Sequence, residues 1–317
     1  MKILFVENYN LEKDNPMSTL YPQRCKKIKE NNLFDVYDIS QNITFDIKTY
    51  STILFGTRSI YLYKCYKSNE KKELTEKFNK LLNIKNKYFI IQDMHKKTYG
   101  NINNLCELLN KNNIHIIFTF YNNNEAKYIR KLTPNCKHYH LPLHIDANIF
   151  YNKNIVKTYD ILLYGSIHPS HYPFRKRLFD LLLNNKEKYN IMYIDKPENY
   201  DPLKCENGLS DLINQSKICI ATCSKYDYFV AKYLEIAFCK SVVAGNMATD
   251  GVNIFENNYV ELNEKMSDQD ILNKLDEYLD NNTKYEQIVN NVHQKIFCDL
   301  NINNYVSKLL DILNTTN

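Results

Sequence analysis

The chain has 317 residues and a mass of 37.7 kDa, which is more than one hydrophobic core usually supports and suits two domains. Hydrophobic residues make up 44% and charged residues 24%, as in ordinary globular proteins, which excludes disorder throughout. The net charge of +5 is small and forms no long basic stripe, so it fits an anionic small molecule such as a nucleotide at least as well as a nucleic acid.

Glycine and cysteine usage excludes several common sites. The chain has only 6 glycines, and neither the Gly-x-Gly-x-x-Gly dinucleotide fingerprint nor the phosphate loop of P-loop proteins occurs. The 9 cysteines are an odd number without a Cys-x-x-Cys pair, so we expect buried thiols in a reducing compartment rather than a zinc site. We expect neither a signal peptide nor a membrane span, and therefore a cytoplasmic protein.

Short apolar strands alternate with helical patterns along the first half of the chain. We expect strands at 2–6, 35–39, 51–55, 88–92, 114–118 and 138–143, and helices near 19–31, 70–83, 101–111 and 124–132. The apolar residues in these strands are continuous, which indicates burial on both faces. Such strands alternating with helices predict a parallel, doubly wound sheet.

The same pattern restarts after an aperiodic stretch at 147–158, and we expect the two domains to join near 145–157. We expect strands at 159–164, 190–194, 217–222, 241–244 and 259–262, and helices near 173–184, 208–215, 228–239, 267–280, 284–296 and 302–314. The sequence thus predicts an α/β protein with two doubly wound Rossmann-like domains, residues 1–150 and 151–317. The last helix is a candidate to pack back on the first domain. Ligands bind at the carboxyl ends of strands in such folds, so we expect a cleft there.

The loop that opens the second domain has the features of a phosphate site. Gly165 and Ser166 directly follow a strand, and the next helix begins with the basic run Arg175-Lys176-Arg177. We expect that helix to present its N-terminus and all three cations to the ligand, because both features attract phosphate. The alternative is an ordinary strand–helix connection with a basic first turn.

A second candidate segment covers residues 224–245. Asp227 lies in a loop beside Tyr228, and Lys232 and Glu235 share one face of the following helix because they are three residues apart. Asp227 and Glu235 can therefore approach one ligand from the loop and from the helix. The alternative is a surface Lys–Glu pair that adds little stability.

This segment resembles the signature of GT-B glycosyltransferases of the "glycosyl transferases group 1" type. That signature has an acidic residue, seven further residues, a helical Glu and then a Gly-x-Pro-Val-like strand. Lys240 and Val242 stand where the family has Gly and Pro, and Asp227 stands for its first Glu. The loop at Gly165 and the helical tail also resemble the family's donor domain, and the likeness covers about residues 159–314.

The resemblance implies transfer of a sugar from a nucleotide-sugar that binds the second domain, with UDP or GDP as the expected nucleotide. Glu235 would bind the ribose and Asp227 the sugar, and both are candidate catalytic residues. The remaining donor-binding candidates are Gly165, Ser166, Arg175, Tyr228, Lys232 and Gly245. The sequence has no convincing acidic metal cluster, so we expect a metal-independent reaction without a cofactor.

The acceptor, a glycan, a protein or a small molecule, would bind the first domain. His95 is the candidate catalytic base there, because histidine is the usual base at neutral pH, and Asp93 lies beside it. Gly56 and Arg58 follow another strand and could line the same cleft. A solvent-exposed loop histidine is the alternative explanation of His95.

Glycine positions add a hint, because Gly56, Gly165 and Gly245 directly follow expected strands and Gly251 lies in a loop after one of them. Glycine suits a tight turn or a close approach to a ligand. Three other functions stay open: a nucleotide-sugar epimerase, DNA-modifying glucosyl transfer or nucleic-acid binding, and a non-catalytic nucleotide-sugar-binding domain.

Overall fold

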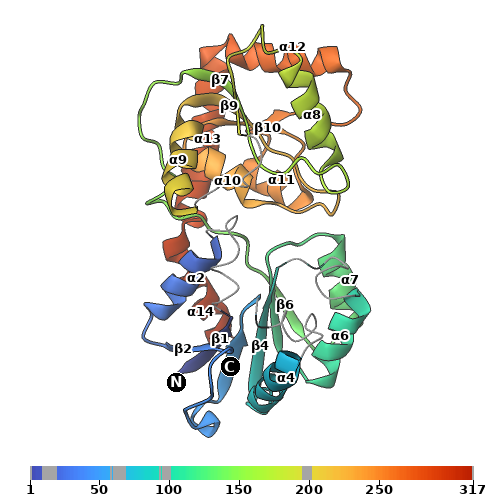
Figure 1. Ribbon diagram of the computed structural model, residues 1–317, viewed down its shortest axis with the longest axis vertical. Coiled ribbons are helices and arrows are strands. Elements are labelled where there is room, and N and C mark those ends of the chain that lie inside the picture. The colour runs from blue at the N-terminus through green and yellow to red at the C-terminus, as the bar shows by residue number, and fades with distance from the viewer. Residues whose placement is uncertain are drawn as a thin grey trace. The chain divides into compact units, whose positions relative to one another are not determined.

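The chain folds into two compact α/β units. The computed structural model describes residues 2–8, 20–57, 59, 69–92, 94, 101–194 and 202–315. Unit 1 comprises Met1–Pro142 together with Tyr305–Asn317, and unit 2 comprises Leu143–Asn304. Each unit contains one parallel sheet with helices, as the sequence predicts (Figure 1).

Unit 1 contains a six-stranded parallel sheet in the order β2-β1-β3-β4-β5-β6. Its strands are β1 (Ile3–Glu7), β2 (Phe34–Asp38), β3 (Thr52–Phe55), β4 (Asn86–Ile91), β5 (Ile116–Thr119) and β6 (Lys137–His140). β1, β3 and β5 are buried along their whole length, which explains their continuous apolar sequences. The strand order reverses between β1 and β3, so their carboxyl ends form the switch point of this sheet.

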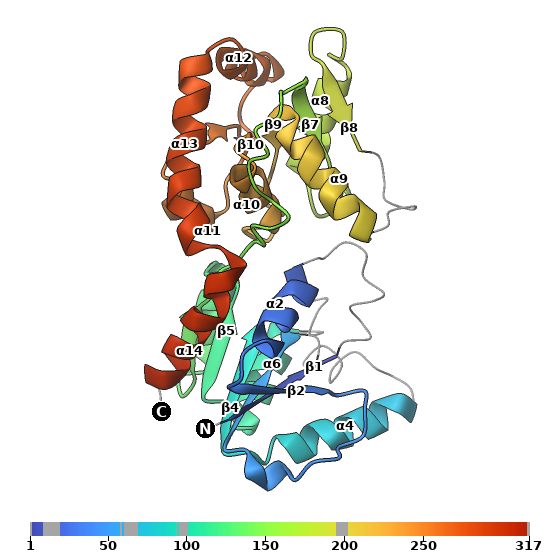
Figure 2. The ribbon, with the colours of Figure 1, turned by 90° about the vertical axis from the view of Figure 1, so that its left-hand side faces the viewer.

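Helices complete unit 1. Those within the described residues are α2 (Leu20–Lys29), α4 (Asn69–Leu81), α6 (Ile102–Lys111), α7 (Asn124–Leu132) and α14 (Tyr305–Thr315), with a short 3-10 turn η1 (Ile47–Thr49). The side chains of Asn101 and Asn123 cap α6 and α7, which fixes where these helices begin. α14 lies beside α2 in both views (Figures 1 and 2). The C-terminal helix of the chain therefore packs against a helix of unit 1.

Unit 2 contains a five-stranded parallel sheet in the order β11-β10-β9-β7-β8. Its strands are β7 (Tyr159–Leu163), β8 (Ile191–Tyr193), β9 (Ser216–Ile220), β10 (Val242–Gly245) and β11 (Val260–Glu261). This is the flavodoxin-like doubly wound order, in which the switch point lies between the first and third strands. The carboxyl ends of β7 and β9 are therefore the expected ligand position in unit 2.

The helices of unit 2 cover its sheet, and a hydrophobic core is built on the face formed by alternate strand residues such as Ile161, Ile218 and Val242. They are α8 (Pro173–Leu183), α9 (Pro202–Asn214), α10 (Ala231–Phe238), α11 (Thr249–Phe255), α12 (Asp268–Leu279) and α13 (Asn282–Asp299), followed by the 3-10 turn η2 (Ile302–Asn304). α13 packs against α10 and α12 (Figure 2). Among the described helices, none combines the length and the apolar character needed to cross a membrane.

Several boundaries differ from the sequence expectations. α9 begins at Pro202 rather than near 208, and α10 begins at Ala231 rather than 228 because Val230 has extended backbone. The helix α11 was not expected, since seven residues are too few to show a period. Gly251 lies inside α11, where an added Cβ would be 2.4 Å from the sulfur of Met247, so it serves packing and not a ligand-facing loop.

Candidate active site

The switch point of unit 2 brings two loops together. Gly165 follows β7 after Tyr164, and Thr222 follows β9. Gly165 has φ of +88°, a left-handed conformation that glycine adopts without strain. A Cβ on Gly165 would lie 2.7 Å from the Nζ atom of Lys232. The left-handed turn therefore favours glycine, and a Cβ at this position would also force the Nζ atom of Lys232 to shift.

Arg175 connects the two loops from the first turn of α8. Its Nη1 donates to the carbonyl of Ser166 at 3.0 Å, its Nε donates to the hydroxyl of Thr222 at 3.1 Å, and its Nη2 donates to the carbonyl of Thr222 at 2.8 Å. The ring of Tyr172 lies 3.9 Å from the guanidinium carbon. Only 3% of Arg175 is exposed, and burial lowers its pKa, although a guanidinium keeps its charge at neutral pH.

Lys232 adds a second buried cation at the same place. It lies in the first turn of α10 and is 8% exposed. Its Nζ donates to the carbonyl of Tyr164 and lies 3.7 Å from the centroid of the Tyr164 ring. Burial and, to a smaller extent, the charge of Arg175 hold the pKa of Lys232 well below its usual range. Two desolvated cations at one glycine turn form a strong attractor for an anion.

Glu235 and Tyr164 lie next to Lys232. Glu235 is half-buried on α10, one turn after Lys232, and its Oε2 accepts a long hydrogen bond of 3.4 Å from the hydroxyl of Tyr164. Burial, reinforced by the charge of Glu235, raises the pKa of Tyr164 well above its usual range, so this phenol stays protonated. Tyr164 thus contacts Lys232 through its carbonyl and Glu235 through its hydroxyl. Sequence reasoning missed it, because an aromatic residue at a strand end looks like core.

Asp227 makes a hydrogen bond that stabilises the fold. Its backbone is left-handed, with φ of +57°, and its Oδ1 accepts a hydrogen bond of 2.9 Å from the amide of Thr249. Thr249 is the first residue of α11, and the N-cap residue Ala248 has no side chain that could accept this bond. Asp227 therefore caps α11, while Tyr228 beside it is 4% exposed. The sugar-binding role of Asp227 stays a prediction.

Gly245 and Asn246 fix the loops after β9 and β10. Gly245 has φ of +151°, and a Cβ there would lie 1.7 Å from the carbonyl oxygen of Ala221. The amide of Asn246 accepts from the backbone of Cys223 at 3.1 Å and donates to Glu264 at 2.9 Å. Gly245 thus permits close backbone packing beside the site. The bracing role of Asn246 was not apparent in the sequence.

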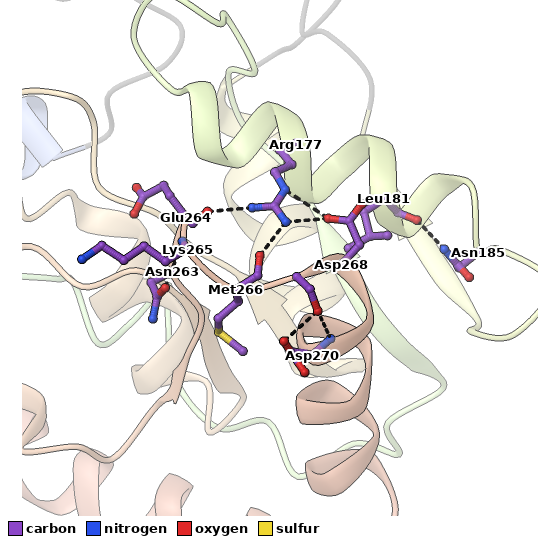
Figure 3. Close-up of polar contacts among 10 residues, drawn as sticks. Arg177, Leu181, Asn185, Asn263, Glu264, Lys265, Met266, Asp268 and Asp270 are labelled. Carbon is purple, nitrogen blue, oxygen red and sulfur yellow. Dashed lines mark hydrogen bonds and ion pairs between the residues drawn. The ribbon is translucent and has the colours of Figure 1, made fainter.

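The basic run does not present all three of its cations to one ligand, so that expectation is wrong. Lys176 pairs with Asp180 on the surface of α8. Arg177 pairs with Asp268 at 2.6 Å and donates to the carbonyls of Glu264 and Met266, which fixes the loop that leads into α12 (Figure 3). The remaining member, Arg175, alone reaches the loops after β7 and β9.

Only one of the residues predicted for the acceptor side, Gly56, lies within the described part of the chain. Asp93, His95 and Arg58 lie outside the described residues. Gly56 follows β3, and an added Cβ would lie 2.0 Å from the Oε2 atom of Glu7, so this glycine makes room for a carboxylate. Glu7 is 2% exposed, and its Oε1 accepts from the amides of Asn8 at 3.0 Å and Ser59 at 2.9 Å. Within the described ranges, no group of three His, Cys, Asp or Glu side chains is arranged to hold a metal ion.

Comparison with known proteins identifies the fold. No family model and no curated protein sequence matches the chain. An α-glucosyltransferase in complex with UDP matches with a TM-score of 0.64 and 10% identity, over 99% of this chain and 100% of that chain. HepE from Anabaena in complex with UDP matches with the same values.

Sucrose-phosphate synthase from Thermosynechococcus elongatus gives a TM-score of 0.60 and 9% identity over the whole of both chains. At such low sequence identity, the match shows that the helices and strands are arranged alike and says nothing about the residues of the site. The shared arrangement is that of two α/β units in one chain, each with its own sheet of parallel strands. The chain therefore has the GT-B fold of glycosyltransferases.

Proposed function

We propose that this chain transfers a sugar from a UDP-sugar donor to a hydroxyl group of an acceptor. The observation that carries the proposal is the convergence of Arg175 and Lys232, both buried, on the turn at Gly165. Buried cations are unfavourable unless an anion compensates them, and the carboxyl edge of the sheet is where ligands bind in this fold. The solved structures of similar fold that contain UDP or UDP-glucose support UDP as the nucleotide.

The geometry supports a distinct proposed task for each of these residues. Lys232 and the amides of the Gly165–Ser166 turn would bind the diphosphate, with Arg175 holding that turn to the loop after β9. During transfer the bond from the anomeric carbon to the UDP oxygen breaks, and the acceptor oxygen bonds to that carbon and loses its proton. The two cations would stabilise the negative charge that grows on the departing UDP. Glu235 would accept hydrogen bonds from the ribose hydroxyls.

The test combines binding with turnover. UDP, GDP and dTDP are titrated into the full chain by calorimetry, and release of the nucleotide from the corresponding sugars is followed with and without acceptors. Glu235→Ala is expected to lose turnover while its thermal melting stays unchanged, whereas Glu187→Ala, which alters an exposed carboxylate of the same unit, keeps wild-type turnover. Absence of binding by all three nucleotides overturns the proposal. Acceptor-independent conversion of the sugar would instead indicate an epimerase.

DNA is a second candidate acceptor. An α-glucosyltransferase in complex with UDP and a 13-mer DNA containing a HMU base matches this chain with a TM-score of 0.63 and 10% identity. Binding through phosphates weakens steeply as salt rises, because counterions are released. A duplex oligonucleotide titrated at two salt concentrations therefore tests this candidate. A sugar-modified duplex as the reaction product would establish it.

A further inference from the structure

The two units have opposite net charges. Unit 1 contains 24 Lys and Arg residues against 14 Asp and Glu residues, a net charge of +10, whereas unit 2 contains 17 against 22, a net charge of −5. The chain's total of +5 is therefore the difference between a basic unit and an acidic one. Such an asymmetry indicates that the basic unit meets an anionic partner, such as a nucleic acid or a membrane surface.

Much of the positive charge of unit 1 lies in residues 80–140, which contain 10 Lys and Arg residues and only 3 Asp and Glu residues. This stretch includes β4, β5 and β6 at one side of the sheet, together with α6 and α7. Lys85 and Lys87 lie at the start of β4, His115 directly precedes β5, and Lys137 is the first residue of β6. These cations therefore lie at the amino ends of the strands, opposite to the carboxyl ends where ligands of doubly wound sheets bind.

Backbone hydrogen bonds hold the three strand starts together. The amide of His115 donates to the carbonyl of Lys87 at 3.0 Å, and the amide of Lys137 donates to the carbonyl of His115 at 2.8 Å. Neighbouring strands lie about 4.8 Å apart, so these residues are close neighbours. Burial and, to a smaller extent, the charges of Lys87 and Lys85 lower the pKa of His115. Lys85 therefore belongs to the same group of cations.

The ends of α6 and α7 add two further lysines. Lys111 is the last residue of α6, and Lys131 lies in the last turn of α7. The side chain of Asn110 donates to the carbonyl of Leu132 at 2.9 Å, so the two helices, which lie side by side in Figure 1, meet at these ends. We call the resulting surface the basic edge; it consists of Lys85, Lys87, Lys111, Lys131 and Lys137.

No carboxylate neutralises the basic edge within the described ranges. None of its five lysines forms an ion pair there, whereas unit 2 pairs lysines such as Lys153 and Lys188 with aspartates. Lys87 is half-buried and the other four are exposed. A cation in the last turn of a helix stabilises that helix, which explains Lys111 and Lys131. It does not explain the three lysines at the strand starts, which have no helix end to stabilise.

We propose that the basic edge binds the phosphate backbone of a nucleic acid without reading its sequence. Lysine ammonium groups bind phosphates as point charges, and contacts to phosphates carry no sequence information. An anionic bilayer is the competing partner, but stable attachment to a bilayer needs an apolar anchor besides the cations. In the described part of unit 1 the large exposed apolar side chains are Leu33 and Tyr128, and neither belongs to the basic edge. The site is separate from the proposed donor site and does not depend on the proposed transferase function.

The salt dependence of binding tests the proposal. A fluorescent DNA duplex of about 20 base pairs is titrated with the full chain, and anisotropy is measured between about 50 and 200 mM salt. Each neutralised phosphate contributes about −0.9 to the slope of log affinity against log salt, so five lysines allow a slope of up to about −4.5. With three to five phosphates contacted, the affinity is expected to fall about 40- to 500-fold over this range. A duplex of unrelated sequence should bind equally.

A triple variant locates the contact. Lys85→Gln, Lys87→Gln and Lys137→Gln are combined, because these lysines have neither an ion pair in the described part of the chain nor a helix end to stabilise. The variant is expected to bind the duplex about tenfold or more weakly at the lowest salt, with a slope that is shallower by about 2.7. Its melting temperature should equal that of the wild type.

The matched control removes the same charge elsewhere in unit 1. It combines Lys26→Gln, Lys29→Gln and Lys72→Gln, which alter exposed lysines of α2 and α4. The control is expected to keep the wild-type affinity and slope, because it leaves the basic edge intact. Equal losses in the two triple variants would attribute binding to the overall charge and overturn the proposal.

The other outcomes are equally decisive. Failure of the wild type to bind the duplex at the lowest salt overturns the proposal. Tighter binding to vesicles with about one third phosphatidylserine than to the duplex would assign the basic edge to a membrane instead. A salt-sensitive oligomer in sedimentation that is absent from the basic-edge variant would assign it to a second copy of the chain. These measurements contain no UDP-sugar, so their result and that of the transferase assay can be read separately.

Discussion

Replacing Lys232 by Met removes one buried positive charge from unit 2 and keeps an unbranched side chain of similar length. A hydrogen bond to a charged group contributes about 1.5–3 kcal/mol, and 1.4 kcal/mol corresponds to a tenfold change in affinity. If Lys232 binds the diphosphate, Lys232→Met should weaken UDP binding by about 10- to 150-fold. Arg175 and Glu235 stay in place, so the loss is attributable to this one contact.

The same substitution should leave the unliganded protein at least as stable at neutral pH. The Met variant loses the hydrogen bond to the carbonyl of Tyr164 and the contact with the Tyr164 ring. The substitution also removes the free-energy cost of burying a charged side chain, since Lys232 is only 8% exposed. Because folding depresses the pKa of Lys232, the unfolded chain binds more protons between the folded and the unfolded pKa values. The stability contributed by Lys232 therefore rises with pH across that window, and the Met variant should lack this rise.

Calorimetric titration with UDP and thermal melting between pH 6 and 10 measure both effects. Lys176→Met is the matched control, because Lys176 is one residue from Arg175 yet pairs with Asp180 on the surface. It should bind UDP as the wild type does. Wild-type affinity for UDP in Lys232→Met would refute the assignment of the diphosphate to this turn. A large loss of stability in the unliganded variant would show that Lys232 serves the fold instead.

Four further predictions follow from the same contacts. At a pH near the depressed pKa of unliganded Lys232, UDP binding should be accompanied by proton uptake, because the diphosphate raises that pKa. Calorimetry at several pH values, in buffers of different ionisation enthalpy, measures this uptake, and heats that do not depend on the buffer at any pH would contradict it. Tyr164→Phe should raise the KM for the donor by roughly threefold to tenfold without changing the melting temperature, because it removes only the 3.4 Å bond to Glu235; an unchanged KM would contradict that role. Gly165→Ala should weaken UDP binding and lower stability by about 1–2 kcal/mol in denaturant titration, since a left-handed alanine is strained and its Cβ would crowd Lys232; a neutral effect would refute the tight-turn argument. Lys240→Gly should be about 1 kcal/mol more stable than Lys240→Ala, because both lose the side chain but only glycine relieves φ of +51°, and equal stability would contradict the strain.

The fold was predictable because its signal is repeated many times. Most buried strands of the two sheets have a continuous apolar run, as in Ile53–Phe55, and most of these runs are followed by a helical pattern. Element ends were less accurate, because they depend on single local contacts. The side chain of Asn123 caps α7 directly before its first residue. The cap of α11, in contrast, is the carboxylate of Asp227, which accepts from the amide of Thr249 and is distant in sequence. A seven-residue helix that is capped by a residue from another segment has no recognisable start signal in the sequence.

The candidate site was predictable where one residue type is unusual in its context. A cation in the first turn of the helix after a buried strand can bind phosphate, which singled out Arg175. Lys232 was found through its spacing from Glu235 and through the resemblance to the glycosyltransferase signature. Their neighbours could not be separated in the same way, because Arg177 finds its partner Asp268 across 91 positions of the chain. Tyr164 was missed for the opposite reason, since an aromatic residue beside a strand is usually core. Contacts between distant segments decide such roles, and a single sequence does not contain them.

The departures from the glycosyltransferase signature have a different meaning in three dimensions. Lys240 stands where the resemblance expects glycine, and its backbone nevertheless has the left-handed φ of +51° that favours glycine. Asp227, which replaces a glutamate, is also left-handed, and one of its two carboxylate oxygens caps α11. The left-handed backbone at both positions thus does not require glycine in this chain. If Asp227 binds the sugar, as the resemblance implies, its Oδ1 atom already caps α11 and only Oδ2 remains for the sugar. The distance between α11 and the donor is then expected to limit which sugars fit.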